Sequence, residues 1–422
     1  MKRSVNVILD ASVLGIGFYY RQSQTGVSRV MERLILGLWE TDGVTMSLAA
    51  STHLPETMRY AHTLFGSAGP AFVNRPTERG QAVIENALLG SFAVDSLPTK
   101  LIREGFYRTR KALRAEEARF DTRQWPADSI YHSQFFPIPG AVAKDRAVHT
   151  VQTIYDLISI LHPEWFLKGE DTVRRVVETL PPDAHVVTIS EATKQDLCNY
   201  VPIDPARVTP IRLAASPTLF YSVTDPSAIQ AVRQQYGLGD SPYLLSLATF
   251  EPRKNIDHLV RCFARVARSG DIPAGVKLVL VGTKGWKFDK IMSELAQHSD
   301  LRSRFIITGF VPDGQLAPLY SDALGFVYPS LYEGFGLPPL EAMQCGLPVI
   351  TSAIPSLNEV VGDASISVPP TDADALCQAI ITVVNSASVR AELAMKSVQR
   401  AKLFSWDKFI TEHVALYNRI LK

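Results

Sequence analysis

Residues 328–352 read YPSLYEGFGLPPLEAMQCGLPVITS, and the fold can be argued outward from this stretch. A predicted strand, 325–327, precedes this stretch, and a loop with Gly334 and Gly336 follows the strand. A Pro-Pro pair comes next and favours a helix start, because the fixed φ of proline suits the first helical turn. The pattern predicts a helix over 339–345 and a strand over 348–351. This strand–loop–helix–strand order is typical of a parallel sheet.

The same loop suits an anionic ligand, since glycines permit close backbone approach and the amides at a helix start favour negative charge. Two carboxylates flank it: Glu333 precedes the glycines, and Glu341 falls in the first turn of the predicted helix. A carboxylate accepts hydrogen bonds from two vicinal hydroxyls, so this pair suits a sugar-bearing ligand. Taken singly, Glu341 is also a favourable charge at a helix N-terminus, and Glu333 is also an ordinary loop residue.

A second cluster, TFEPRKNIDHLV, occupies 249–260 between a predicted strand and a predicted helix. Arg253 and Lys254 therefore lie at the carboxyl end of another strand. Arginine offers a planar fork and lysine a point charge, a combination that suits a diphosphate. In a cleft they would offset the charge of a leaving group. An exposed basic pair at a helix start is the competing interpretation, and it is disfavoured because cations oppose the helix dipole there.

Short apolar runs alternate with amphipathic stretches along most of the chain, which predicts an α/β fold with doubly wound parallel sheets. Helix signals lapse over 210–230, so we expect two Rossmann-like domains, 1–215 and 225–405. Such domains bind ligands beyond the carboxyl ends of their strands, which makes the cleft between them the expected active site. The predicted strands are 4–9, 46–50, 129–132, 149–154, 186–189, 243–248, 277–281, 305–307, 325–327 and 348–351. The predicted helices include 27–39, 191–200, 256–268, 288–297, 374–386, 389–404 and 406–421.

Composition argues against several other classes of protein. In 422 residues, 43 Lys and Arg balance 42 Asp and Glu, whereas a nucleic-acid partner requires a net basic surface. No apolar run approaches the roughly 20 residues of a membrane-spanning helix, and the N-terminus predicts a strand in place of a signal peptide. The four cysteines lack zinc-ligand or disulfide spacing, as expected in a reducing compartment. We expect a cytoplasmic enzyme.

One segment departs from this pattern. Residues 100–123 hold eight basic and four acidic residues, with apolar side chains interleaved. One interpretation is a peripheral contact with an anionic membrane on its inner face, or with a lipid-phosphate substrate. The other is a solvated helix whose apolar side packs on the first domain. Glu116 and Glu117 dilute the positive charge and favour the second interpretation.

Several stretches resemble the retaining glycosyltransferases of family 4, which have the GT-B fold. In the second half these are EPRKN, LVGTKGW, TGFVPDGQLAPLY, PSLYEGFGLPPLEAMQCGLPVI and FSW. In the first half they are TGVSRV (25–30), VQTIYDLISILHPEWF (151–166) and TISEATKQDL (188–197). The resemblance is strongest over 243–406 and thins over 51–125, the part of the first domain where acceptor choice is expected to lie.

The resemblance implies a role for each matching position. Arg253 and Lys254 would bind the donor diphosphate, Glu333 would contact the donor sugar, and all three would be catalytic. Glu341 would hold the nucleotide ribose. Many family members have His-Asp-Leu where this chain has Tyr-Asp-Leu, so the sugar contact at Tyr155 is expected to differ. Asp156 would orient loop amides, and Gly282 with the segment 309–311 would line the base pocket. The full set of other donor-binding positions is Gly26, Tyr155, Asp156, Gly282, Phe310, Val311, Gly334, Phe335, Gly336, Leu337 and Glu341.

The resemblance also implies retaining transfer of a hexose from a nucleotide-diphosphate sugar to a hydroxyl of a growing saccharide or lipid-linked glycan. GDP-mannose is the preferred donor, ahead of UDP-glucose and dTDP-rhamnose. No cofactor or metal is expected, since Arg253 and Lys254 replace the cation. The Asp-x-Asp sequence at 372–374 begins a predicted helix, so we predict that it caps this helix. The C-terminal helix, 406–422, would cross back to the first domain.

Other functions use similar folds. A nicotinamide-dependent oxidoreductase needs G-x-G-x-x-G after a strand, and Gly15 and Gly17 lack the third glycine. A sugar-nucleotide epimerase, or a nucleotide-sugar-binding subunit without activity, would share the fold and stays open as the alternative.

Overall fold

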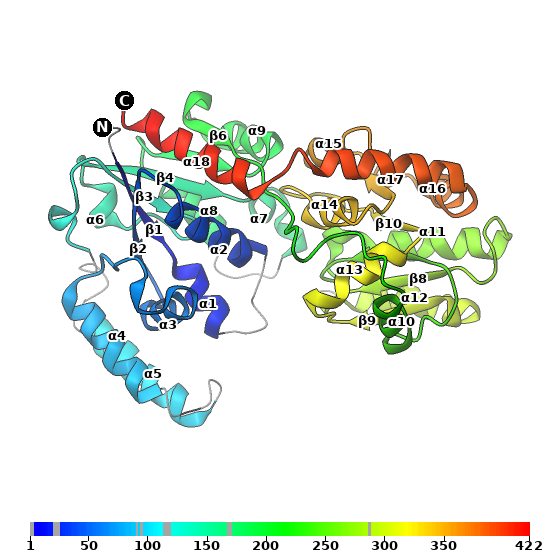
Figure 1. The fold of residues 1–422 in the computed structure, drawn as a ribbon, viewed down its shortest axis with the longest axis horizontal. Helices are drawn as coiled ribbons and strands as arrows, with labels where there is room; N and C mark the ends of the chain where they lie inside the picture. Colours follow the sequence, from blue (N-terminus) through cyan, green and yellow to red (C-terminus); the bar gives the residue numbers. More distant parts are fainter. Residues whose placement is uncertain are drawn as a thin grey trace.

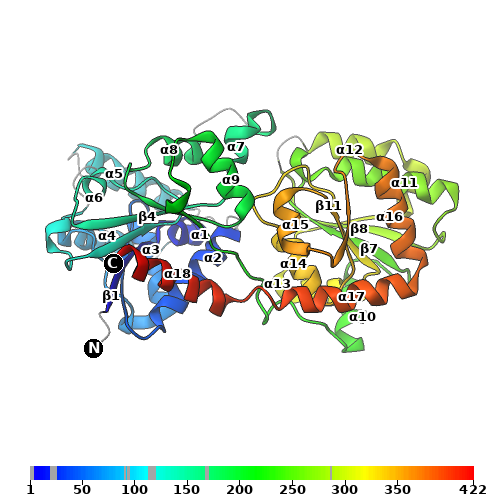
Figure 2. The ribbon, with the colours of Figure 1, turned by 90° about the horizontal axis from the view of Figure 1, so that it is seen from above.

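The computed structural model describes residues 4–19, 26–89, 92, 96–112, 120–166, 171–285 and 288–422. Within these ranges the chain forms two α/β domains that lie side by side, with helices on both faces of each sheet (Figures 1 and 2). The predicted α/β class with two doubly wound domains is confirmed.

The first sheet contains six described strands, all parallel, in the order β2-β1-β3-β4-β5-β6. Most residues of its central strands are buried on both faces, the polar ones included, as expected where helices cover both faces. The order reverses between β1 and β3, which is where ligands of such sheets bind. The strands are β1 (Val5–Asp10), β2 (Val44–Ala49), β3 (Ser129–Ser133), β4 (Val148–Ile154), β5 (His185–Thr188) and β6 (Val208–Pro210).

The second sheet also contains six described parallel strands, in the order β12-β11-β10-β7-β8-β9. Its order reverses between β7 and β10, so the loops that follow these two strands meet at one edge. All ten predicted strands are present within two residues of their predicted ends, and β6 and β12 were not predicted. The strands are β7 (Tyr243–Leu247), β8 (Lys277–Val281), β9 (Phe305–Gly309), β10 (Gly325–Tyr328), β11 (Val349–Ser352) and β12 (Ser365–Val368).

Helices connect the strands in both domains. In the first they are α1 (Ser12–Tyr19), α2 (Gly26–Trp39), α3 (Leu54–Phe65), α4 (Pro76–Leu89), α5 (Leu97–Ala112), α6 (Gly140–Ala143), α7 (Ile158–Leu161), α8 (Thr172–Glu178) and α9 (Glu191–Tyr200). After them come α10 (Pro226–Gln235), α11 (Ile256–Ser269), α12 (Asp289–Ala296), α13 (Asp313–Asp322), α14 (Leu337–Gln344), α15 (Pro355–Val361), α16 (Ala373–Asn385), α17 (Ala387–Ala401) and α18 (Trp406–Ile420).

The last helix, α18, returns to the first domain, as the family resemblance implied (Figures 1 and 2). It packs on α2, where Gly37 permits close approach: a Cβ at this position would lie 2.4 Å from Cγ1 of Ile410. Tyr417 of the same helix makes a hydrogen bond of 2.7 Å with Nδ1 of His132, on β3. The C-terminal end of the chain is therefore part of the first domain's core.

Three expectations need correction. Helix signals do not lapse over all of 210–230, because α10 begins at Pro226, after Asp225 caps it by accepting from the amide of Ser227. Helix α13 was not predicted. Of the segment 100–123, residues 100–112 belong to α5, which begins at Leu97, and Thr122–Gln124 form a 3₁₀ turn, whereas 113–119 lie outside the described residues. The predicted cap is confirmed, because Asp372 accepts from the amide of Ala375 at the start of α16.

Gly37→Ala and Gly105→Ala should change the free energy of unfolding in opposite directions. The methyl group at position 37 would overlap Ile410 and should lower the free energy of unfolding by about 1–3 kcal/mol. Gly105, within α5, has no atom within 4 Å of an added Cβ, so the same change there should raise it by up to about 1 kcal/mol through helix propensity. Denaturant titrations of both variants test this, and an unchanged Gly37→Ala protein would contradict the close packing of α18 on α2.

Candidate functional site

The candidate site lies where the strand order of the second sheet reverses. The loop after β7 carries Arg253 and Lys254 in a 3₁₀ turn, and the loop after β10 carries Glu333. The two strands pair in parallel, so both loops leave the sheet at the same edge. A backbone hydrogen bond of 2.8 Å from the amide of Leu331 to the carbonyl of Arg253 joins them.

These loops bring three of the predicted residues into one charged cluster. Arg253 donates to Glu333 at 2.7 Å, and Lys254 donates to the other carboxylate oxygen at 2.5 Å. The hydroxyl of Tyr328, on β10, donates to Glu333 at 2.9 Å and accepts from Lys254 at 2.5 Å. Glu251 adds a second carboxylate, 2.6 Å from Nε of Arg253. Sequence analysis missed Tyr328 and Glu251, although both stand within five residues of predicted positions.

The cluster is buried, and its charges set its protonation states. Burial opposes ionisation of Glu333, but the charges of Arg253 and Lys254 outweigh burial and lower the pKa of its carboxyl to about 2. Burial, and then the charge of Arg253, lowers the pKa of Lys254. Burial raises the pKa of Glu251. Glu333 is thus ionised at neutral pH and holds both cations at the edge of the sheet.

The glycine loop that follows Glu333 touches the first domain. A Cβ at Gly334 would lie 2.5 Å from the carbonyl oxygen of Tyr155, so the close contact between the domains requires glycine. The carbonyl of Gly334 accepts from Ser190 at 2.7 Å and from Thr193 at 3.3 Å. Ser190 is also the predicted cap of α9, since it accepts from the amide of Thr193. Neither contact with Gly334 was predicted from the sequence.

Helix α14 starts differently from the prediction. It begins at Leu337, with Gly336 at φ 129° as its N-cap. Glu341 is therefore its fifth residue and lies beyond the first turn, which corrects the predicted position. The next two residues, Pro338 and Pro339, carry no N–H, so Leu337 is the only one of the first three helical residues that can donate an amide to a ligand. Phe335 is buried and packs edge-on against Phe404.

Glu341 lies apart from the charged cluster, in a cavity of about 210 Å³ between the domains. Burial raises the pKa of its carboxyl to about 7, and the hydroxyl of Tyr320 donates to it at 3.3 Å. Gly26 lines the same cavity, and a Cβ there would lie 3.7 Å from Cδ1 of Leu337. Across the cavity, Arg29 of α2 donates to Asp313 of α13 at 2.7 Å. Sequence analysis missed this ion pair between the domains.

Tyr155 and Asp156 follow β4 of the first domain. Asp156 accepts from the amide of Ile158 at 3.0 Å, and burial raises the pKa of its carboxyl. The hydroxyl of Tyr155 donates to Gln134 at 3.0 Å, and Gln134 in turn makes a hydrogen bond of 3.0 Å with Nε2 of His132. Because His132 also bonds to Tyr417, this chain of contacts runs from the site to α18. Sequence analysis missed Gln134, which stands alone after β3 without any motif.

The predicted base pocket lies at the ends of β8 and β9. Gly282 has φ 154°, and a Cβ there would overlap the carbonyl oxygen of Ala248. Its amide donates to the carbonyl of Gly309 at 3.1 Å. Val311 is buried, whereas Phe310 is 72% exposed. The glycines therefore lie next to each other at the sheet edge, and Phe310 is the predicted residue most available to a ligand there.

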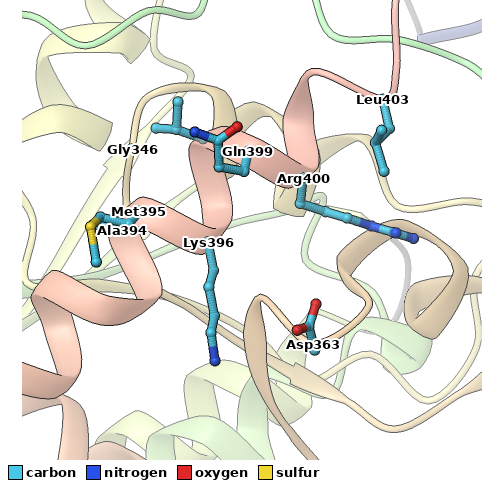
Figure 3. Close-up of a pocket in the computed structure, with 9 residues that line it drawn as sticks. Gly346, Asp363, Ala394, Met395, Lys396, Gln399, Arg400 and Leu403 are labelled. Carbon is cyan, nitrogen blue, oxygen red and sulfur yellow. The ribbon is translucent and has the colours of Figure 1, made fainter.

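A larger hollow, of about 790 Å³, lies beside α17 and is lined by none of the predicted site residues (Figure 3). Its wall is formed mainly by 394–403 with Gly346 and Asp363. We place the candidate site at the edge of the sheet and in the cavity between the domains, because the buried charges gather there.

Glu333→Gln tests the electrostatics of the cluster. The pKa of about 2 lies below the ordinary value of 4.5, so the ionised group stabilises the fold above pH 4.5, and this stabilisation is lost as the pH falls towards 2. The shift corresponds to about 3 kcal/mol. The difference in unfolding free energy between the native protein and the variant should therefore shrink from pH 5 to pH 2.

The matched control is Glu392→Gln, which removes an exposed carboxylate paired with Lys396 at 2.7 Å. This variant should differ from the native protein by less than about 1 kcal/mol at every pH. Denaturant titrations at several pH values measure both. A pH-independent effect of Glu333→Gln would show that its carboxylate is not held ionised by the two cations.

Comparison with known proteins identifies the family. The family described as "Glycosyl transferases group 1" matches residues 228–403. O-antigen chain mannosyltransferase B of Escherichia coli is 33% identical over 294 residues, which is 69% of this chain and 74% of that protein. Serotype-specific mannosyltransferase WbdA of Escherichia coli is 32% identical over 283 residues, which is 65% of this chain but 34% of that longer protein.

The fold is also found among solved structures. Sucrose-phosphate synthase from Thermosynechococcus elongatus superposes with a TM-score of 0.67 over 99% of both chains, at 21% sequence identity. Three observations lead to the same family and fold. The chain has two doubly wound sheets, it superposes on the solved structure over almost its whole length, and it is 33% identical to the first Escherichia coli protein. The chain belongs to the group 1 glycosyltransferases and has the GT-B fold.

Proposed function

We propose that this glycosyltransferase moves mannose from GDP-mannose, with retention of configuration and without a metal ion, to a hydroxyl of a growing saccharide or lipid-linked glycan. The observation that carries the proposal is the buried cluster of Arg253, Lys254 and Glu333 at the edge of the sheet. The mannosyltransferases among the relatives support mannose as the transferred sugar. The second domain would bind the donor, and the first the acceptor.

In this proposal the two cations act on the donor diphosphate. Arg253 and Lys254 would share their charge between Glu333 and the phosphates, and so stabilise the charge that develops on the leaving group. Glu333 would accept hydrogen bonds from hydroxyls of the donor sugar. The amide of Leu337 and the glycine loop before it would approach the diphosphate from the side away from the two cations. Gly26 has no side chain and so leaves room for the diphosphate.

The acceptor proton needs a base. An oxygen of the donor phosphate would take the proton of the acceptor hydroxyl, on the same face of the donor sugar from which the leaving group departs. This is the front-face displacement expected for retaining relatives. The protein's part would then be to stabilise charge and exclude water. Gln134 would position the hydroxyl of Tyr155 toward the sugar. Gly282, Gly309 and Phe310 would line the base pocket, and Glu341 would hold the ribose.

Lys254→Met tests the proposed chemistry directly. The variant keeps much of the side-chain volume and removes the charge, so we expect transfer from GDP-mannose to fall by about 10²–10³-fold. Lys396→Met, on the surface of α17, is the matched control and should transfer at the native rate. Nuclear magnetic resonance of the product should show the anomeric configuration of the donor, and EDTA should leave the rate unchanged.

The donor panel should also include UDP-glucose and dTDP-rhamnose. Faster transfer from either would replace GDP-mannose as the donor. An inverted product, or loss of activity in EDTA, would contradict the proposed mechanism. Interconversion of nucleotide sugars would favour an epimerase, and tight GDP-mannose binding without transfer to any saccharide or lipid-linked acceptor would favour a binding subunit.

Binding of GDP should depend on pH through Glu341. Its pKa of about 7 is above the ordinary value, so the protonated carboxyl stabilises the free protein at low pH, and this stabilisation is lost as the pH rises through 7. Ribose hydroxyls donate to the ionised form, so affinity for GDP should increase as the pH rises from 6 to 8. Titration calorimetry measures this change. Glu341→Gln should abolish it, and an identical pH dependence in that variant would remove Glu341 from the ribose site.

A further inference from the structure

Helix α4 exposes a row of apolar side chains. From Gly80 onward its buried residues are Ala82, Glu85 and Leu89, whereas Ile84 is 57% exposed and Leu88 is 49% exposed. A surface helix ordinarily turns its apolar stripe to the core and its polar side to solvent, so apolar residues on the outer side are unusual. The exposed positions of this part of α4 carry no charge: they are Gly80, Val83, Ile84, Ala87 and Leu88.

The start of α5 extends this apolar face. Leu97 is 72% exposed and Leu101, one turn later, is 64% exposed. Phe92, between the two helices, is also exposed. Helices α4 and α5 pack side by side at the margin of the first domain, away from the second domain (Figure 1). Single exposed apolar residues are ordinary, but a face of this extent without charge on α4 marks an interaction site.

Positive charge adjoins the apolar face. Helix α5 contains five basic residues and one acidic residue. Arg103 turns inward to Glu56 at 3.0 Å, and Arg108 pairs with Glu104 on the surface, whereas Lys100 is exposed beside the two leucines. A groove of about 560 Å³ also borders α4, and its lining includes Arg59, His62 and Val83. An apolar face bordered by cations is complementary to a bilayer of anionic lipids.

We propose that α4 and the first turns of α5 dock on the surface of an anionic phospholipid membrane. The side chains of Val83, Ile84, Leu88, Leu97 and Leu101 enter the boundary between headgroups and acyl chains, and Lys100 contacts lipid phosphates. The contact is peripheral, since none of the described helices combines the length and apolar character needed to cross a bilayer. Membrane contact over 100–123 was one of two interpretations of the sequence, and the less favoured one. The exposed apolar side chains that now support such a contact lie on α4 and at the start of α5.

This inference does not depend on the proposed donor or reaction. It would, however, place the first domain next to the membrane and so give the enzyme access to a lipid-linked acceptor. A test must separate the contribution of the apolar side chains to membrane binding from that of the positive charge. It must also separate both contributions from an effect of the substitutions on folding.

The experiment measures flotation of the full-length protein with phosphatidylcholine vesicles, with and without about one third phosphatidylglycerol. The native protein should float with the anionic vesicles. The double variants Ile84→Ser/Leu88→Ser and Leu97→Ser/Leu101→Ser should each weaken binding at least about tenfold. Lys100→Ala should weaken it about fivefold, as expected for one cation near an anionic surface.

The matched control is Met395→Ser/Leu403→Ser, which removes two apolar side chains of similar exposure, 67% and 54%, from the second domain beside the α17 hollow (Figure 3). It should bind vesicles like the native protein. All variants should keep the native thermal unfolding midpoint and the native rate with a water-soluble acceptor, because none of these residues lies in the candidate site.

Three results would overturn the proposal. Equal loss of binding in the control would show a nonspecific effect of apolar exposure. Equal flotation with neutral and anionic vesicles would show that charge complementarity with anionic lipids does not contribute to binding. Failure to bind either vesicle, together with a dimer in solution that the α4 and α5 serine variants dissociate, would show that a second copy of the chain covers this face.

Discussion

Arg253 and Lys254 hold Glu333 between them at the edge of the second sheet, and the arrangement of the site follows from this buried contact. Each of the three charges would be costly to bury alone, and together they offset one another. The contact joins the loops after β7 and β10, the two strands between which the sheet reverses its order. It thus fixes both loops at once, and the glycine loop that touches the first domain starts directly after Glu333.

The domains meet through polar contacts, one of which is made by this loop and another by α15. Ser190 donates to the carbonyl of Gly334, and the carboxylate of Glu359 accepts from the amides of Glu191 and Ala192 at 2.9 and 2.7 Å. A carboxylate from the second domain therefore complements the positive end of α9 in the first. The pair between Arg29 and Asp313 joins the domains at another place, the cavity that Glu341 lines.

The sequence predicted the parts of the fold whose local pattern agrees with the tertiary structure. The apolar strands and the caps at Ser190 and Asp372 are of this kind. Helix α10 was missed because it begins inside 210–230, where helix signals were expected to lapse. Its start at Pro226 follows a capping aspartate, and proline at that position favours a helix start. Helix α13 carries Pro318 in its interior, which obscures its pattern. The position of Glu341 was wrong because the helix begins at Leu337, two residues before the start predicted from the prolines.

The candidate site was predicted where residues are grouped in motifs and missed where they come together only in the fold. Arg253, Lys254 and Glu333 were identified from two short stretches, and the structure brings them together. Glu341, expected to contact another part of the same ligand, lines the cavity between the domains, away from the charged cluster. Gln134 reaches the site from a distant part of the chain, and no local pattern distinguishes it from other polar residues. Asp313 lies two residues after the predicted segment 309–311, but its partner Arg29 comes from the first domain.

The return of α18 to the first domain means that the chain passes between the domains twice. The segment after β6 and the start of α18 lie close together, since 214–216, Leu219, Phe220 and Trp406 line the same cavity. Two adjacent connecting segments restrict the relative motion of the domains more than one segment does. They oppose twisting of one domain against the other about the long axis of the molecule, and they leave rotation about the line that joins the two segments. The two domains should therefore open and close by rotation about this one hinge axis, and the angle between the domains should govern entry of the donor.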